Sequence, residues 1–323
     1  MDQNKKLILV SLPPDRITGE DWKKIEQASG GREILFTNDI EEIKKQLDRI
    51  EIIVGAAPWE LLGKMPELRW YQSWGAGIDG LVDHPELKDT PLQITNTSGI
   101  HGEQLREHIF ALILAHSRRF PRVFAAQKKH EWLSITDIDV PVIAGKTMLI
   151  LGYGSIGEQT AKTALAFGMK VIGLRRHPAP SIPGIRIETA DKLPDLLGEA
   201  DYVVNILPHT PDTRGIIGKN EFSLMKKEAV YVNVGRGSTT NEPELIEALN
   251  AGRISAALLD VAVQEPLPPD SPLWETENLI ISPHYAGMRP DYAKLAMDIT
   301  LENLNRYNRG ETLINLTDKN AGY

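Results

Sequence analysis

Short apolar runs alternate with longer amphipathic stretches along the whole chain. Near the N-terminus the predicted strands are KLILVSL, REILFTN, IEIIVGA and LRWYQSW, and the predicted helices between them are GEDWKKIEQASG and DIEEIKKQLDR. Strands that alternate with helices at this spacing indicate βαβ units and a parallel sheet. Their nearly continuous valine, isoleucine and leucine content fits strands that are covered on both faces. The pattern therefore predicts an α/β fold.

A domain boundary is expected near residues 96–99, where the pattern changes. After it, HGEQLREHIFALILAHSRRF predicts a long helix, and PRVFAAQKKHEWLS continues helically with exposed aromatic residues. A second alternating series follows, with the predicted strands KVIGLR, YVVNIL, AVYVNVG, AALLDV and LIISPH. The tail, DYAKLAMDITLENLNRYNRGE, predicts a helix that crosses back onto the first domain. The predicted domains are thus 1–98 plus 289–323, and 99–288.

Composition narrows the function mainly by exclusion. At 323 residues the chain exceeds what one hydrophobic core usually supports, which agrees with two domains. A net charge of −8 argues against nucleic acid or anionic membranes as partners, because both need basic surface. The chain has no cysteine, so disulfides, thiolate metal sites and cysteine nucleophiles are excluded. No run approaches the roughly 20 apolar residues of a membrane helix, and we expect a cytoplasmic protein.

The stretch MLILGYGSIGEQTAKTALAFG joins a buried-strand pattern to a helix through a GxGxxG motif. In that setting the motif favours dinucleotide binding over a merely structural glycine turn. Gly152 permits the tight turn, Gly154 lets the backbone approach a pyrophosphate, and Gly157 allows close packing of helix on strand. The amides of Ser155 and Ile156 then face an anion at the helix N-terminus.

Two arginines, Arg175 and Arg176, stand where a dinucleotide-binding unit usually carries an acidic residue for the ribose hydroxyls. The next acidic residue along the chain is Glu188. Guanidinium groups would pair with a 2′-phosphate, whereas a carboxylate would repel it. The hypothesis is therefore a preference for NADP(H), with NAD(H) as the open alternative. The competing interpretation is that both arginines are solvated surface charges.

Three later stretches carry polar residues directly after apolar strands, where open α/β sheets place ligand contacts. They are VNVGRGS with Arg236, LLDVAVQEPLPPDSPLW with Asp260 and Glu265, and LIISPHYAG with His284. Taken singly, Arg236 fits a surface turn, Glu265 a solvated loop and His284 a core histidine. Their order behind a dinucleotide motif favours catalytic roles instead.

With these motifs, the chain closely resembles the D-isomer-specific 2-hydroxyacid dehydrogenase family, which includes glyoxylate/hydroxypyruvate reductases. The resemblance rests on GYGSIG, NILPHTPDTRGII, VNVGRGS, LLDVAVQEPLPPDSPLW, SPHYAG, SWGAGIDGL and SGIHGEQLREH, and it covers nearly the whole chain. It implies two Rossmann/flavodoxin-like, doubly wound parallel-sheet domains, with a discontinuous substrate domain built from both ends of the chain. It also implies a homodimer formed through the cofactor domains, which fits the aromatic segment RRFPRVFAAQKKHEW.

The resemblance further implies roles for individual residues. His284 would give a proton to the keto oxygen, with Glu265 orienting the imidazole and favouring its charged form. Arg236 would hold the substrate carboxylate and polarise the carbonyl, and the amides of Ala76 and Gly77 would bind the same carboxylate. The remaining implied cofactor contacts are Leu207, Pro208, Thr213, Val234, Gly235 and Asp260.

The first hypothesis is thus an oxidoreductase that reduces small 2-keto acids to D-2-hydroxy acids by hydride transfer from NADPH. The second is a cofactor-sensing interaction protein, like the transcriptional corepressors that share this fold. Phosphoglycerate dehydrogenases are disfavoured because many carry a C-terminal regulatory domain, and formate dehydrogenases because they carry Gln where Glu265 stands.

Neither a metal site nor the identity of the keto acid follows from these residues. His101 and His108 lie seven positions apart rather than four, so no metal site is expected. The side chain of the keto acid stays open, because it depends on loops around Trp59, Trp74, Ile100, Trp274 and Met288.

Overall fold

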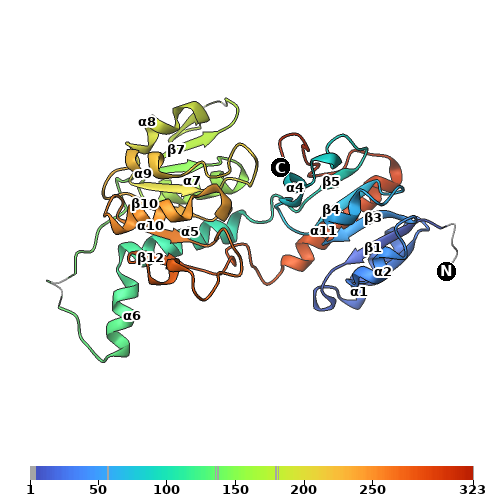
Figure 1. Cartoon of the computed structure of the whole chain (residues 1–323), viewed down its shortest axis with the longest axis horizontal. Coiled ribbons are helices and arrows are strands. Elements are labelled where there is room, and N and C mark those ends of the chain that lie inside the picture. The colour runs from blue at the N-terminus through green and yellow to red at the C-terminus, as the bar shows by residue number, and fades with distance from the viewer. Residues whose placement is uncertain are drawn as a thin grey trace. The chain divides into compact units, whose positions relative to one another are not determined.

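The fold is known from a computed structural model that describes residues 5–56, 58–134, 136, 138–178, 180 and 182–322. The chain divides into two compact units, a first unit of Met1–Ile100 with Arg289–Tyr323 and a second unit of His101–Met288 (Figure 1). Within the described residues, each unit contains one sheet whose strand pairs all run parallel. The predicted pair of parallel-sheet α/β domains, the first of them discontinuous, is confirmed.

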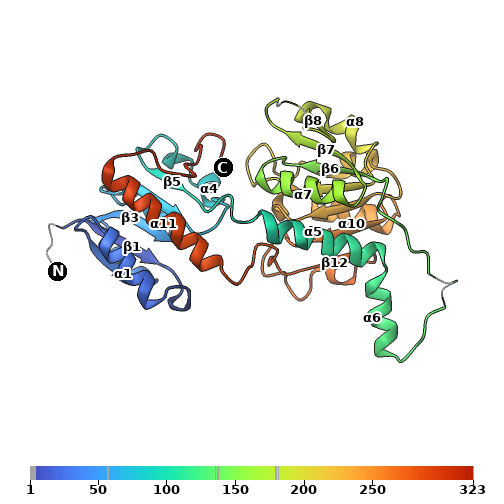
Figure 2. The same cartoon turned by 180° about the vertical axis from the view of Figure 1, so that it is seen from behind.

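The first unit is built on a sheet with the strand order β2-β1-β3-β4-β5. The strands are β1 (Leu7–Ser11), β2 (Glu33–Phe36), β3 (Ile50–Gly55), β4 (Trp70–Ser73) and β5 (Gln93–Thr95). The helices are α1 (Gly19–Ala28), α2 (Ile40–Lys44), α3 (Trp59–Leu62), α4 (Gly80–Asp83) and α11 (Tyr292–Arg309), with 3-10 turns at Pro14–Arg16 and Pro85–Leu87. One face of the sheet packs against α1 and α11, as Figure 2 shows, and the other face against α2, α3 and α4.

The tail helix α11 completes the first unit through buried polar contacts. The indole Nε1 of Trp74 donates to Oγ1 of Thr300 at 2.9 Å, and Nδ2 of Asn303 donates to Oε1 of Gln72 at 2.9 Å. All four side chains are less than a tenth exposed. Because buried polar groups are costly without partners, these bonds fix α11 in one position on the sheet.

The second unit is built on a sheet with the strand order β12-β11-β10-β9-β6-β7-β8. The strands are β6 (Thr147–Leu151), β7 (Lys170–Arg175), β8 (Ile185–Thr189), β9 (Tyr202–Asn205), β10 (Val230–Asn233), β11 (Ala256–Leu259) and β12 (Leu279–Ile281). The helices are α5 (Gly102–Ser117), α6 (Phe120–Lys128), α7 (Ser155–Ala166), α8 (Leu193–Leu197), α9 (Lys219–Leu224) and α10 (Glu242–Asn250), with 3-10 turns at Ala190–Lys192, Gly237–Thr239 and Pro272–Glu275. Helices α5 and α7 pack on one face, and α8, α9 and α10 on the other. The strand order reverses at β6, which is where open α/β sheets bind ligands.

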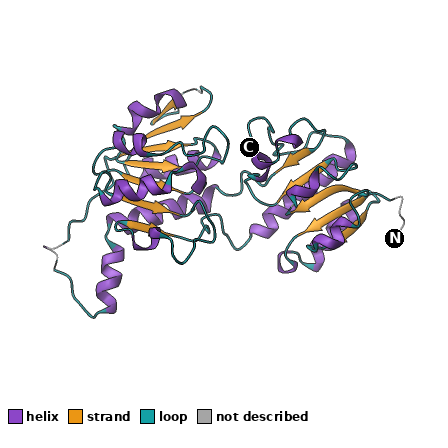
Figure 3. Ribbon diagram, in the orientation of Figure 1, coloured by secondary structure: helices purple, strands orange, loops and turns teal. Residues whose placement is uncertain are grey.

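The long helix predicted after residue 100 is wrong in its extent. It is two helices, α5 and α6, separated by Arg119 in the left-handed conformation (φ 58°), and the residues after Lys128 leave the helix. The reason is Pro121 in the first turn of α6, because proline has no amide hydrogen to continue the hydrogen bonding of α5 through this point. Figure 3 shows α6 projecting from the body of the second unit.

Candidate active site

The glycine loop between β6 and α7 is shaped by close backbone approaches. Gly152 has φ +92°, and a Cβ at this position would lie 3.1 Å from the backbone of Ile206. A Cβ on Gly157 would lie 3.0 Å from the carbonyl oxygen of Gly152. A Cβ on Gly154, by contrast, would have no described atom within 4 Å. The loop is therefore packed against the sheet at two glycines and open at the third.

The N-terminus of α7 opens onto this loop. Ser155 and Ile156 lie in the first turn of the helix, where main-chain N–H groups have no intrahelical acceptor. Gly154 and Ser155 are exposed, so an anion can reach these donors, and the helix dipole favours it. The open glycine, the helix N-terminus and the switch point at β6 fit the pyrophosphate of a dinucleotide.

The two arginines after the glycine loop differ in their contacts. Arg175 is the last residue of β7 and is exposed. Arg176 donates from Nη2 to Oδ2 of Asp212 at 2.9 Å, and these two side chains are 47% and 76% exposed. Asp212 belongs to the loop after β9, beside Thr213. This carboxylate was not predicted from the sequence, where its only signal is its place next to an expected cofactor contact.

Strands β9 and β10 both end in a buried asparagine whose side chain makes hydrogen bonds to the main chain of the following loop. Oδ1 of Asn205 accepts the N–H of Leu207, and Oδ1 of Asn233 accepts the N–H of Gly235, each at 3.0 Å. Nδ2 of Asn233 also donates to the carbonyl oxygen of Arg236 at 3.1 Å. The two asparagines face each other in the sheet register. They fix both loops, and neither was predicted from the sequence.

A buried hydroxyl cluster holds these amides in turn. Nδ2 of Asn205 donates to the hydroxyl of Tyr231 and to Oγ1 of Thr239, both at 2.8 Å, and Nδ2 of Asn233 donates to Oγ1 of Thr240 at 3.0 Å. Burial raises the pKa of Tyr231 to about 12 although its hydrogen bonds to Asn205 and Thr240 oppose that rise. The phenol therefore stays protonated and available as a donor within the cluster.

Arg236 stands between two glycines that neighbouring loops press against. A Cβ on Gly235 would lie 2.5 Å from the carbonyl oxygen of Leu207, and one on Gly237 would lie 2.0 Å from the carbonyl carbon of Ala262. No side chain fits at either position without moving backbone. The main chain of Arg236 is thus clamped between the loops after β9 and β11, and its Nη1 donates to the carbonyl oxygen of Gly235 at 2.8 Å.

Two other predicted cofactor contacts, Pro208 and Thr213, lie in a turn after β9 that is closed by its own hydrogen bonds. Oγ1 of Thr213 donates to the carbonyl oxygen of Pro208 at 2.6 Å and accepts the N–H of Thr210 at 2.9 Å. Leu207 precedes this turn. Val234 differs from them, because its side chain is 6% exposed and lies in the core of the second unit.

The carboxyl edge of the sheet brings His284 and Glu265 together. Nδ1 of His284 lies 2.5 Å from Oε2 of Glu265, while Oε1 of Glu265 accepts the N–H of Ala262 at 2.9 Å. The two side chains are 45% and 35% exposed, so the pair faces solvent rather than the core. The interpretation of His284 as a core histidine does not apply. An exposed imidazole whose Nδ1 is occupied by a carboxylate can exchange a proton at Nε2.

Asp260, at the end of β11, is 1% exposed. Its carboxylate accepts Oγ–H of Ser282 at 2.6 Å and the N–H of Ala286 at 3.0 Å, and Nε2 of His108 lies 3.3 Å away. Burial raises the pKa of Asp260, but the hydrogen bonds from His108, Ser282 and Ala286 outweigh it and hold that pKa below its ordinary value. The carboxylate is ionised and bound by its own chain, and its expected contact with the cofactor stays a prediction.

The predicted carboxylate-binding residues Ala76 and Gly77 belong to the first unit, in the loop after β4, and are partly exposed. The carbonyl oxygen of Ala76 accepts Nδ2–H of Asn96 at 2.9 Å, which restrains the loop. Their role in substrate binding stays a prediction. Trp74, expected to border the substrate pocket, is 8% exposed and lies in the core of this unit.

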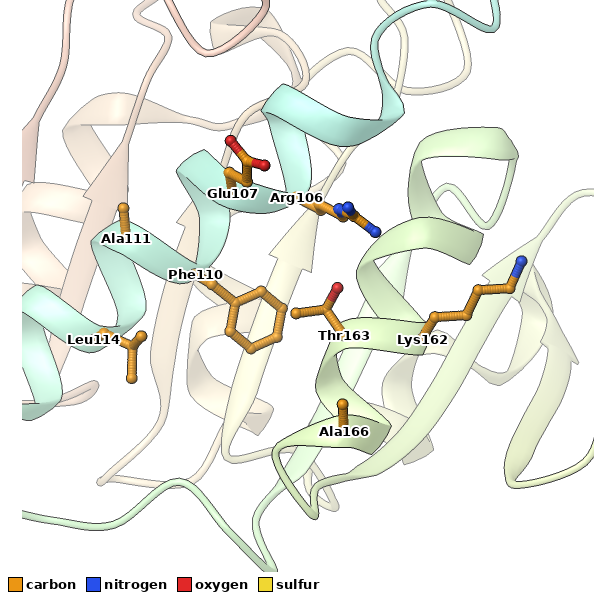
Figure 4. A pocket seen from close by; sticks show the side chains of 8 residues that line it. All are labelled: Arg106, Glu107, Phe110, Ala111, Leu114, Lys162, Thr163 and Ala166. Atoms are coloured by element: carbon orange, nitrogen blue, oxygen red, sulfur yellow. The ribbon is translucent and has the colours of Figure 1, made fainter.

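A groove on the second unit lies between α5 and α7 (Figure 4). Its floor is apolar, from Phe110, Leu114 and Ala166, and Arg106 and Lys162 stand at its rim. Because α7 starts at the glycine loop, Lys162 and Ala166 lie about two to three turns away from that loop. The groove is therefore separate from the strand-end residues described above.

In the part of the chain that the structure describes, no cluster of three or more histidine, aspartate or glutamate side chains could hold a metal ion. The helices described in either unit are all too short or too polar to cross a bilayer.

Comparison with known proteins gives a consistent result. The family model for the D-isomer specific 2-hydroxyacid dehydrogenase, NAD binding domain, matches residues 110–286. A glyoxylate reductase from Korarchaeum cryptofilum is 30% identical over 307 residues, which cover 92% of this chain and 89% of that protein. A D-3-phosphoglycerate dehydrogenase from Methanocaldococcus jannaschii is 31% identical over 304 residues, 93% of this chain but 57% of that longer protein. The NADPH-dependent glyoxylate/hydroxypyruvate reductase from Sinorhizobium meliloti, solved with NADP and sulfate, has a TM-score of 0.84 at 29% identity and covers 99% of this chain and 100% of that one.

Proposed function

The chain belongs to the D-isomer-specific 2-hydroxyacid dehydrogenase family, and on that premise we propose that it reduces a small 2-keto acid to the D-2-hydroxy acid with NADPH. The observation that carries the proposal is the 2.5 Å contact between His284 and Glu265 at the carboxyl edge of a dinucleotide-binding sheet. Arg236 follows β10, the strand next to β11 in the sheet, and adds a cation at the same edge. The names of the relatives support glyoxylate or hydroxypyruvate as the substrate class.

The reduction needs a hydride at the carbonyl carbon and a proton at the carbonyl oxygen. The nicotinamide cofactor, when bound, supplies the hydride. Because Glu265 occupies Nδ1 of His284, the proton leaves from Nε2 and the imidazole ends neutral while the keto oxygen becomes a hydroxyl. The carboxylate also holds the ring in one orientation before the transfer.

Arg236 is proposed to bind the substrate carboxylate. Its planar guanidinium can make two parallel hydrogen bonds to a carboxylate, and its charge polarises the adjacent carbonyl. Neighbouring backbone packs closely against the glycines on both sides of Arg236. The main chain of Arg236 is therefore held in place, and with it the base of the side chain. A side chain whose base is held in place loses less conformational entropy when it binds and orients the substrate.

We propose NADP(H) as the preferred cofactor, with NAD(H) as the weaker alternative. Arg175 and Arg176 follow the glycine loop at the end of β7 and can pair with a 2′-phosphate. The Sinorhizobium meliloti relative is NADPH-dependent, which supports this assignment. Asp212 already neutralises part of the charge of Arg176, so the preference is expected to be moderate.

We also propose a homodimer formed through the second unit. Helix α6 projects from that unit, and Phe120 and Phe124 on it are 43% and 55% exposed, with Trp132 beyond it 99% exposed. Such aromatic side chains on a projecting element are typical of an interface.

The proposed function is tested by assaying the full chain with glyoxylate, hydroxypyruvate and larger 2-keto acids, each with NADPH and with NADH. We expect reduction of at least one of these acids, faster with NADPH, and the D-isomer on chiral analysis of every product that has a stereocentre, which leaves out glycolate, the achiral product of glyoxylate. Formation of the L-isomer would contradict the assignment. Binding of NADPH without reduction of any acid would instead favour a cofactor-sensing interaction protein.

A further inference from the structure

A histidine outside the proposed catalytic set belongs to a buried network beneath the loop of His284. Nε2 of His108, on α5, lies 2.9 Å from Oγ of Ser282 and 3.3 Å from Oδ1 of Asp260. The side chains of His108 and Asp260 are 10% and 1% exposed. The side chain of His108 thus reaches from α5 to the residues that follow strands β11 and β12.

The direction of each hydrogen bond in this network follows from the number of protons. The single hydroxyl proton of Ser282 goes to the carboxylate of Asp260, which accepts it at 2.6 Å and has no proton to give. Oγ of Ser282 can then only accept from Nε2 of His108. His108 therefore carries its proton on Nε2 and donates it to Ser282, with Oδ1 of Asp260 as a second, longer acceptor.

The network reaches His284 through the main chain. The carbonyl oxygen of Asp260 accepts the N–H of His284 at 2.7 Å, and its carboxylate accepts the N–H groups of Tyr285 at 3.3 Å and Ala286 at 3.0 Å. His284 has φ +51°, a left-handed conformation that costs energy for a residue other than glycine. Such a conformation persists only where its surroundings enforce it, and the bonds to Asp260 do so here.

His108 also packs against the same loop. Its ring meets the ring of Tyr285 edge to face, with centroids 5.0 Å apart. The loop that carries the exposed imidazole of His284 is thus held by a ring and a hydrogen bond from α5.

We propose that His108 is a positioning residue for the reaction. By donating to Ser282 and Asp260 it holds the loop of Ser282–Ala286 in the conformation that presents His284. This inference rests on the proposed function, since it assigns His284 as the proton donor. It also gives α5, which carries no proposed catalytic group, a direct part in the geometry of the site.

The test compares three variants of the full chain. His108→Phe keeps a ring but removes the donor, His108→Gln restores an N–H near the position of Nε2, and His116→Phe is the matched control on the same helix. We expect His108→Phe to lower kcat for glyoxylate on the order of 10- to 100-fold, because small displacements of a reacting group cost this much. The Kd for NADPH, measured by nicotinamide fluorescence, and the KM for glyoxylate should each change less than about 3-fold, since uniform binding is not affected.

His108→Gln should recover most of the lost kcat, and His116→Phe should equal the wild type. A readout independent of turnover is the Nδ1–H proton resonance of His284 in histidine-labelled protein, which should move or disappear in His108→Phe only. If the wild type reduces no 2-keto acid, the proposed function fails while this resonance still tests the network. An unchanged kcat and resonance in His108→Phe, or a loss confined to NADPH affinity, would overturn the inference. Should that variant not fold, Ser282→Ala takes its place with the same expected outcome.

Discussion

The carboxylate of Glu265 joins two loops at once. Oε2 lies 2.5 Å from Nδ1 of His284, and Oε1 accepts the N–H of Ala262. One oxygen thus meets the imidazole while the other is anchored to the backbone after β11. The orientation of the ring therefore depends on a loop that is fixed independently of the substrate.

The first prediction concerns Glu265→Gln. Glutamine can still accept from Nδ1, but it lacks the negative charge that Glu265 places beside the imidazole. We expect kcat for 2-keto acid reduction to fall about 10²- to 10⁴-fold, the usual contribution of general acid catalysis. Steady-state kinetics and NADPH binding measure this, and Glu275→Gln, at an exposed carboxylate, is the control. Near-normal turnover in Glu265→Gln would contradict the assigned proton transfer.

The second prediction concerns the glycine after Arg236. A Cβ in Gly237→Ala would lie 2.0 Å from the carbonyl carbon of Ala262, so backbone has to move. We expect the free energy of unfolding to fall by about 1–3 kcal/mol, as for overpacked sites, and the KM for the keto acid to rise as Arg236 shifts. Urea unfolding and kinetics measure both. Gly63→Ala is the control, since no described atom lies within 4 Å of its added Cβ.

The third prediction concerns cofactor selectivity. If Arg176 binds the 2′-phosphate as proposed, Asp212 competes with that phosphate for the guanidinium, and exposed ion pairs are worth at most about 1 kcal/mol. Asp212→Asn should therefore raise the ratio of kcat/KM for NADPH over NADH by about 2- to 5-fold, and Arg176→Ala should lower that ratio. The control is Asp298→Asn, an exposed carboxylate on α11. A ratio that both Asp212→Asn and Arg176→Ala leave unchanged would show that neither side chain affects selectivity.

The place of the candidate site residues at the ends of strands could be predicted from the sequence, because these residues follow apolar runs. Buried strands read as apolar runs, and polar residues directly after them, such as Arg236 and His284, belong to the carboxyl edge of the sheet. The glycine spacing is equally local, since Gly157, in the first turn of α7, packs against the carbonyl oxygen of Gly152 only five residues earlier.

The contacts between distant segments could not be predicted, because they depend on the order of the strands. Asn205 and Asn233 meet only because β9 and β10 are neighbours, and His108 meets Ser282 across 174 positions of sequence. Trp74 was expected to border the substrate pocket. In the structure its indole N–H donates to Thr300 on the tail helix, in the core of the first unit. The short strands β5 and β8 were missed for a related reason, since runs of three to five residues carry little periodicity.

The fourth prediction concerns assembly. Phe120 and Phe124 stack on each other on the projecting helix α6, with ring centroids 5.4 Å apart, and both are exposed. If α6 contacts a second copy, a charge at its centre is disfavoured in the interface. We expect the wild type to sediment as a dimer and Phe124→Glu as a monomer with unchanged far-UV circular dichroism. A wild type that sediments as a monomer at micromolar concentration would contradict the dimer.

The fifth prediction follows from a histidine that the proposed chemistry does not use. Burial, with a smaller effect from Arg119, lowers the pKa of His116 from 6.5 to about 4. Between these two values the unfolded chain binds a proton that the folded chain does not. The stabilisation of the folded state is therefore complete above pH 6.5 and is lost as the pH falls toward 4.

The loss is measured by comparison with His116→Gln, which cannot take up that proton. Because part of the side chain reaches solvent, the full linkage is discounted to about 2 kcal/mol. Urea unfolding at pH 7 and at pH 4 should show the wild type losing more stability than the variant by about this amount. The carboxylates titrate in both proteins and cancel in the difference. Parallel curves for the two proteins would mean that His116 takes up its proton equally in the folded and unfolded states.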